Sequence, residues 1–225
     1  MMDKFRQVAD EFRTVVAGRG NLLDALIPPV LFLLLNALLG FQYAMWGSLG
    51  LALLLMALRL ARRQSLLYAL SGVGAVALAI LLTLLLDRAE GYFLPNIITG
   101  GLIALACLVS ILVRRPLVAW SSVVARRWPL AWYWHPRVRP AYSEVTGLWV
   151  AYFSARLLLQ AILFQRGATG SLAVVQFVMG WPATVLLLVI SYLYGTWRLR
   201  TLGGPSVEEF KAGAEPPWHG QQKGF

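Results

Sequence analysis

The sequence predicts an all-α, polytopic membrane protein with six transmembrane helices. Of its 225 residues, 59% are hydrophobic and only 13% are charged, whereas a soluble domain has nearly twice that charged fraction. Apolar runs recur along the chain, each about 20 residues long, which is roughly one bilayer crossing. The basic residues gather in the segments on one side of these runs, as the positive-inside rule requires.

The apolar runs define a transmembrane domain at residues 21–197. The six spans are expected at about residues 22–41, 43–60, 65–86, 94–113, 144–165 and 171–195. Pro28-Pro29 should bend the first span and Pro182 should interrupt the last, because proline removes a backbone donor. Small residues at four-residue spacing, which let helices approach closely, mark the third and fourth spans: Ser71, Ala75 and Ala79, and Gly100 and Ala104.

Two amphipathic or polar segments flank this domain. Residues 1–20 place Phe5, Val8 and Phe12 at helical spacing opposite charged residues, which indicates an N-terminal amphipathic helix lying on the cytoplasmic membrane interface. Residues 198–225 form a cytoplasmic tail, in which Ser206 and Glu209 have the spacing of a capping box.

The formal net charge of +10 is explained by topology. Of 20 Lys and Arg residues, 17 fall on one side of the predicted spans, Arg88 and Arg166 fall on the other, and Arg156 lies between. This asymmetry predicts a multi-pass protein of the cell membrane with both termini cytoplasmic. It also argues against a nucleic-acid partner, since the charges follow the membrane rather than a groove-binding surface.

Signatures of catalysis and of cofactors are missing from the sequence. The two histidines, His135 and His219, lie in a loop and in the tail, and the lone cysteine, Cys107, lies within a span. No phosphate-binding glycine loop and no metal-ligand spacing is present. We therefore expect a non-enzymatic protein with no catalytic residues, no metal and no cofactor.

Arg156 is the most informative residue, because the run from Val145 to Phe164 around it is otherwise apolar. A charged side chain near the centre of a span costs about 2.5–3.5 kcal/mol, so it needs a partner or a function. It shares a helix face, by three- and four-residue spacing, with Trp149, Tyr152 and Gln160. Either these neighbours or a carboxylate satisfy a structural arginine, or the residue binds an anionic group.

Two carboxylates, Asp24 and Glu144, complete the candidate intramembrane polar site. Both lie near the cytoplasmic ends of their spans, about two to three helical turns short of Arg156. Pairing with Arg156 would need a tilted helix or an extended side chain. A carboxylate in the first turn of a helix is also stabilised by the helix dipole, and a proton relay through the two carboxylates is a further alternative.

The connection from Arg126 to Tyr142 is both aromatic and basic. One interpretation is an interfacial belt whose arginines contact anionic lipid headgroups on the cytoplasmic side. The other is a docking surface for a partner membrane protein. The candidate residues for either role are Arg126, Arg127, Trp128, Trp132, Trp134, Arg137 and Arg139.

Several short segments resemble a bacterial family of six-helix membrane proteins, the domain of unknown function 3159, which is distantly similar to the intracellular septation protein A group. The segments that carry the likeness are Asp24-Ala-Leu-Ile-Pro28, Arg59-Leu-Ala-Arg-Arg-Gln64, Ala69-Leu-Ser-Gly72, Tyr92-Phe-Leu-Pro95, Ser110-Ile-Leu-Val-Arg-Arg-Pro116, and Thr146 through Trp149, Phe153, Arg156 and Gln160. They cover about residues 20–165. The resemblance implies an inner-membrane protein with a non-enzymatic role at the cell envelope, beside growth or division machinery.

Two hypotheses for function follow. The first is a scaffold or accessory subunit of a membrane complex, suggested by the lack of catalytic groups, the close-packing residues and the aromatic-basic loop. The second is a small transporter or lipid-handling protein, in which Arg156 contacts an anion in a polar cavity that includes Tyr152, Gln160 and Asn36. The surroundings of Arg156 decide between them.

Overall fold

The computed structural model describes residue 35 and residues 38–62, 65–221 and 224–225. This part of the chain is helical and contains no strand. It forms two compact units: the first holds the described residues up to Pro95 together with Gly167–Phe177, and the second holds the described residues among Asn96–Arg166 and Val178–Phe225.

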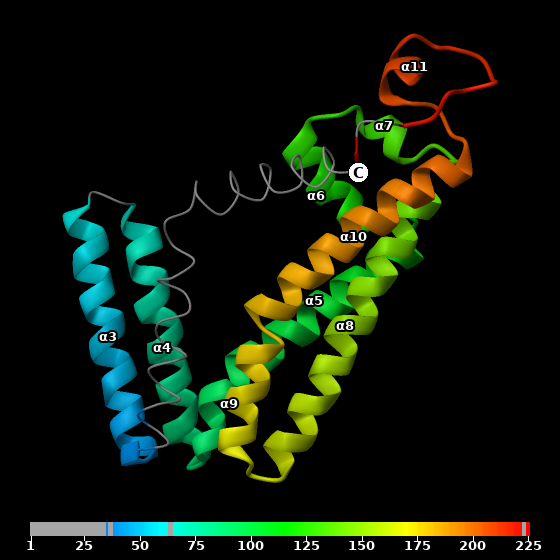
Figure 1. Cartoon of the computed structure of the whole chain (residues 1–225). Helices are drawn as coiled ribbons and strands as arrows, with labels where there is room; N and C mark the ends of the chain where they lie inside the picture. The colour runs from blue at the N-terminus through cyan, green and yellow to red at the C-terminus, as the bar shows by residue number, and fades with distance from the viewer. Residues whose placement is uncertain (1–34, 36–37, 63–64, 222–223) are drawn as a thin grey trace. The chain divides into compact units, whose positions relative to one another are not determined.

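The first unit is centred on a helical hairpin. Helices α3 (Phe41–Ala61) and α4 (Leu66–Leu86) pack side by side (Figure 1). The short 3-10 helix η1 (Ala89–Phe93) then packs on α4, and the unit also holds most of α9 (Thr169–Val178). On α4, Ala79 is buried but Ala75 is exposed, so the predicted small-residue stripe is only partly used within this unit.

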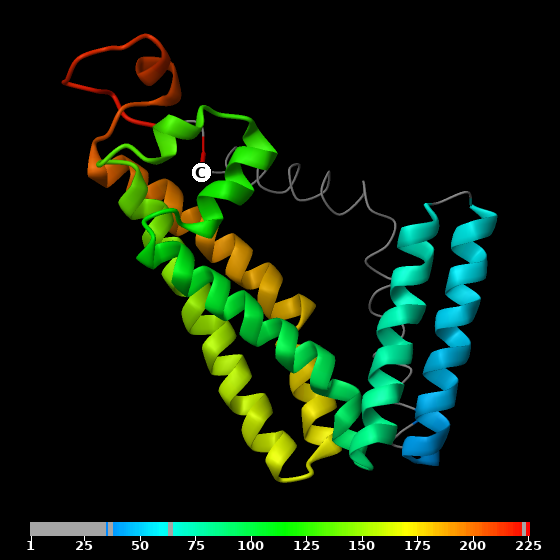
Figure 2. The same cartoon turned by 180° about the vertical axis from the view of Figure 1, so that it is seen from behind.

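The second unit contains three long helices, α5 (Leu94–Leu112), α8 (Arg139–Gln165) and α10 (Trp181–Leu202). They run side by side, as Figure 2 shows from behind. Gly100 and Ala104 of α5 are buried, but a Cβ atom added at Gly100 would meet nothing within 4 Å, so no described helix approaches closely at this glycine. A Cβ atom added at Gly101 would lie 3.5 Å from the Leu157 side chain, which is ordinary van der Waals contact between α5 and α8.

At one end of these helices lies a folded region that we call the aromatic cap. It comprises α6 (Leu117–Arg126), α7 (Leu130–Tyr133), the start of α8, and residues 203–221 and 224–225 with α11 (Val207–Lys211). The side chains of Trp132, Tyr133 and Tyr142 are fully buried in its core. The ring of Phe225 stacks on Tyr142 at a centroid distance of 4.3 Å.

Four segments are long and apolar enough to cross a membrane: Gln42–Ala61, Ala89–Leu112, Arg139–Gln165 and Thr169–Leu202. They indicate a multi-pass membrane protein. Helices α3, α4 and α5 follow the predicted spans to within two residues, whereas α8 begins five residues earlier than the predicted 144. The N-terminal amphipathic helix, Asp24, Asn36 and most of the predicted first span lie outside the described residues.

Candidate functional site

One face of α8 is polar and turned toward the interior of the second unit. Arg156 is only 8% exposed and Gln160 only 1%, while Trp149 and Tyr152 are half-buried. On the opposite face, Leu158 is 64% exposed. The spacing of these residues predicted that they share one face of the helix, and burial shows that this face is turned inward.

The guanidinium of Arg156 is held by a neutral partner. Its Nη2 donates to Oδ1 of Asn96, on the first turn of α5, at 2.6 Å. Its Nε is buried and has no hydrogen-bond partner among the described residues. A buried donor without an acceptor costs about 1–3 kcal/mol, and more when the group is charged. The site thus holds a cation with an unused donor.

Gln160 adds a second unused donor one turn further along α8. Its Nε2 is also buried and lacks a partner in the described part of the chain. Residues four positions apart on a helix are neighbours on its surface. An oxyanion could accept from both side chains, because a carboxylate or phosphate offers several lone pairs.

The interruption of the last predicted span lies beside this face. Helix α9 ends at Val178, Met179 and Gly180 form a turn, and α10 starts at Trp181 with Pro182 in its first turn. The predicted break at Pro182 is confirmed. The hydroxyl of Tyr152 donates to the carbonyl oxygen of Met179, so the side chain that neighbours Arg156 on α8 holds the chain where α10 begins.

No carboxylate of the three long helices lies close to Arg156. On α8 the nearest carboxylate, Glu144, is 12 residues away, about 18 Å along the axis. Helix α5 contains no charged residue between Leu94 and Leu112. On α10 the first charged residue is Arg198, 17 residues after Trp181. Within the described residues, no carboxylate forms an ion pair with Arg156.

Glu144, predicted as part of the same site, has different partners. Its carboxylate accepts two hydrogen bonds from Arg198, at 2.7 and 2.9 Å, and one from the Tyr194 hydroxyl at 2.8 Å. The inclusion of Glu144 in the Arg156 site was therefore wrong, because a cation 54 residues later in the chain satisfies it. This contact, together with the Trp149–Ser191 hydrogen bond of 2.9 Å, fixes α8 against α10.

The residues predicted to form a lipid or partner surface do not all lie on the surface of the cap. Trp132 is fully buried and donates through Nε1 to the Pro205 carbonyl oxygen, so its assignment to a surface was wrong. Arg127 and Arg137 are exposed, while Trp128, Trp134, Arg126 and Arg139 are half-buried. Two of these arginines stack on tryptophan rings, Arg126 over Trp128 at 5.1 Å and Arg137 over Trp218 at 5.4 Å.

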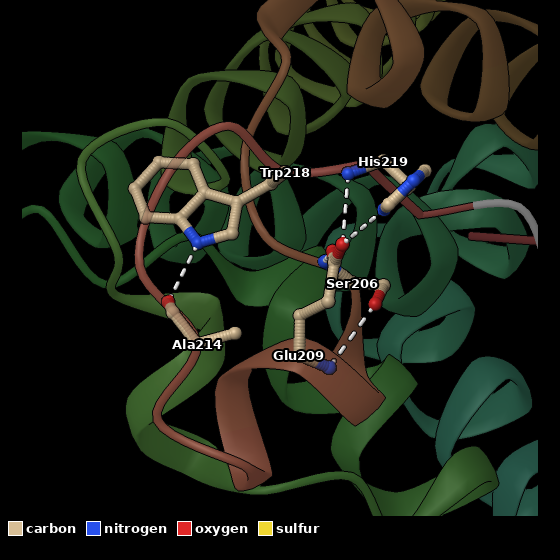
Figure 3. A network of polar contacts seen from close by, with 5 residues as sticks. All are labelled: Ser206, Glu209, Ala214, Trp218 and His219. Atoms are coloured by element: carbon tan, nitrogen blue, oxygen red, sulfur yellow. Dashed lines mark hydrogen bonds and ion pairs between the residues drawn. The ribbon is translucent and has the colours of Figure 1, made fainter.

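Within the tail, residues 206–219 are joined by a network of polar contacts around Glu209 (Figure 3). The predicted capping box is confirmed, since Ser206 Oγ accepts from the Glu209 N–H while the Glu209 carboxylate accepts from the Ser206 N–H. The same carboxylate accepts from the backbone N–H of His219 at 2.8 Å. These donors lower the pKa of Glu209 to about 2. In this way the tail is held in place from Ser206 to His219.

Asn96 is the site residue that sequence reasoning missed. It is the polar side chain that follows Pro95 at the start of an otherwise apolar helix, and that position was the available signal. The described residues contain no group of three or more His, Cys, Asp or Glu side chains placed to hold a metal ion.

A model of the family described as Protein of unknown function (DUF3159) matches residues 16–199. The chain belongs to this family. The expected membership in DUF3159 is thus confirmed, and the matched range includes all the residues of the Arg156 site. Searches of curated proteins and of solved structures found no match.

Proposed function

We propose that this DUF3159 protein binds an anionic group at Arg156 within the membrane, as a small transporter or a lipid-handling protein. The observation that carries the proposal is the lack of a carboxylate beside Arg156 in the described residues, where the guanidinium donates to neutral Asn96. Arg156 costs about 2.5–3.5 kcal/mol near the centre of a span. An external oxyanion would neutralise this charge and accept from the unused donors.

Unfolding of the purified full chain in a neutral detergent tests this proposal. We would add four oxyanions separately: acetate, inorganic phosphate, oleate and a phosphatidylglycerol. A ligand at 100 times its Kd stabilises the folded state by about 2.7 kcal/mol, so at least one anion should raise the unfolding midpoint of the wild type. Arg156→Gln should abolish the rise.

The matched control is Arg166→Gln, which removes an exposed arginine from the end of the same helix. This variant should keep the full response to the anion. The proposal fails if none of the four anions stabilises the wild type, or if Arg156→Gln responds as the wild type does.

A scaffold or accessory subunit of a membrane complex is the second candidate. The aromatic cap supports it, because a folded region with exposed Arg127 and Arg137 offers a surface for a partner protein or for anionic headgroups. The expected position is the bacterial cell membrane with both termini cytoplasmic, and the likeness to the septation protein A group suggests a role beside the growth or division machinery. Purification in mild detergent should retain a partner protein, and replacing Arg127 and Arg137 with glutamate should release it.

A further inference from the structure

We infer that the Arg156 site takes a singly charged oxyanion carried by a lipid, either a fatty-acid carboxylate or a phosphodiester headgroup. The inference rests on the proposed anion site and adds the chemical class of its ligand. Three features of the second unit lead to it: the charge of the site, the arrangement of its donors, and the surfaces of the helices that form it.

The charge of the site matches one negative charge. Arg156 is the cation, and the other side chains that form the site, Asn96, Tyr152 and Gln160, are neutral. A dianion, such as a phosphate monoester, would leave one charge uncompensated where water is scarce, which is unfavourable. A carboxylate or a phosphodiester would leave none.

The donors match an oxyanion rather than a halide. A guanidinium presents its N–H groups as a planar fork, which fits two oxygens of one carboxylate or phosphate. Asn96 occupies Nη2 of Arg156, whereas Nε has no partner in the described residues. Gln160 Nε2 supplies another donor from the same face of α8. The unused donors thus come from two side chains, and two oxygens of one ligand can satisfy them.

The helices that form the site present apolar side chains outward. Leu158 on α8 is 64% exposed, Ile98 on α5 is 49% exposed, and Leu102 on α5 is 61% exposed. On a membrane span such side chains face acyl chains. A small hydrated anion would have to lose its water to cross the acyl-chain region that these outer faces border. An anion on a lipid already has a tail that is compatible with this surface.

The test uses the full chain in a neutral maltoside detergent, which contains no phosphate, with one added lipid at a time: oleate, a phosphatidylglycerol or a phosphatidic acid. Native mass spectrometry or radiolabel retention gives the affinity of each. We expect oleate or phosphatidylglycerol to bind at least about tenfold more tightly to the wild type than to Arg156→Gln, since a hydrogen bond to a charged group contributes at least that factor. Which of the two binds identifies the carboxylate or the phosphodiester as the ligand.

A second variant and a competition measurement keep the inference testable if Arg156→Gln does not fold. Arg156→Lys keeps the charge but loses the planar fork, so it should bind the same lipid several-fold more weakly. In the wild type, acetate and inorganic phosphate should fail to displace the lipid at equal concentration.

These measurements distinguish a wrong ligand class from the lack of an anion site at Arg156. If acetate or inorganic phosphate binds through Arg156 as tightly as the lipids, or if phosphatidic acid as a dianion binds best, the lipid class is wrong while the anion site stands. If no anion of any class depends on Arg156, the proposed function itself is wrong.

Discussion

Replacing Arg156 and Asn96 together with apolar residues should leave the ligand-free protein as stable as the wild type, or more stable. In Arg156→Met/Asn96→Leu, the 2.6 Å hydrogen bond between the two side chains is lost along with the charge. An arginine near the centre of a span costs about 2.5–3.5 kcal/mol, and a hydrogen bond to a charged group contributes about 1.5–3 kcal/mol. The difference places the double variant between about 0.5 kcal/mol less stable and about 2 kcal/mol more stable.

A different result is expected if Arg156 has a structural role as the partner of a carboxylate. If a carboxylate of the chain were paired with Arg156, the double variant would leave that carboxylate buried and alone, at a cost of about 3–5 kcal/mol. Reversible unfolding of the delipidated protein in a neutral maltoside detergent measures the difference. Leu158→Met, on the exposed face of the same helix, is the control for an apolar change and should be neutral. A loss of 3 kcal/mol or more in the double variant, with the control unchanged, would refute the account.

Two predictions concern the tail. Gly195→Ala would place a Cβ atom in steric overlap with the Phe225 ring, so the ring must leave its position; hydrogen exchange of residues 206–221 should then increase. Gly147→Ala, where a Cβ meets nothing within 4 Å, should leave that exchange unchanged and stabilise α8 by about 0.5–1 kcal/mol; equal exchange in both variants would contradict this packing. The tail should also detach in acid. The N–H groups of Ser206 and His219 lower the pKa of Glu209 from 4.5 to about 2, so the carboxylate stabilises the folded tail above pH 4.5 and this stabilisation is lost as the pH falls through about 2. The indole N–H of Trp218 donates to the Ala214 carbonyl oxygen, and its resonance should move toward the position of an exposed indole as the pH falls from 4.5 to below 2. A resonance that stays constant to well below pH 2 would show that Glu209 does not hold the tail.

The parts of the fold that the sequence predicts are those that depend on local spacing. Apolar runs of spanning length located α3, α4 and α5 to within two residues, and Pro182 located the start of α10. The inward face of Arg156 and Gln160 follows from the helical period alone. These features need no knowledge of which helices are neighbours.

The partners of these residues were not predictable in the same way. Asn96 lies 60 residues before Arg156, and Arg198 lies 54 residues after Glu144, so each contact depends on how two helices align along their axes. Composition also could not show whether the aromatic residues of this connection form a buried core or an interfacial belt, because tryptophan and tyrosine are common in both. Trp132 was therefore expected at a surface and lies fully inside the cap.

An experimental structure of the full chain in native lipid would test the central claim most directly, through the group that lies against Nε of Arg156. We predict the oxygens of a bound lipid anion within hydrogen-bonding distance of this atom and of Gln160 Nε2, with Asn96 on the other side of the guanidinium. A carboxylate of the chain itself in that position, such as that of Asp24, would contradict the account and make Arg156 a structural residue.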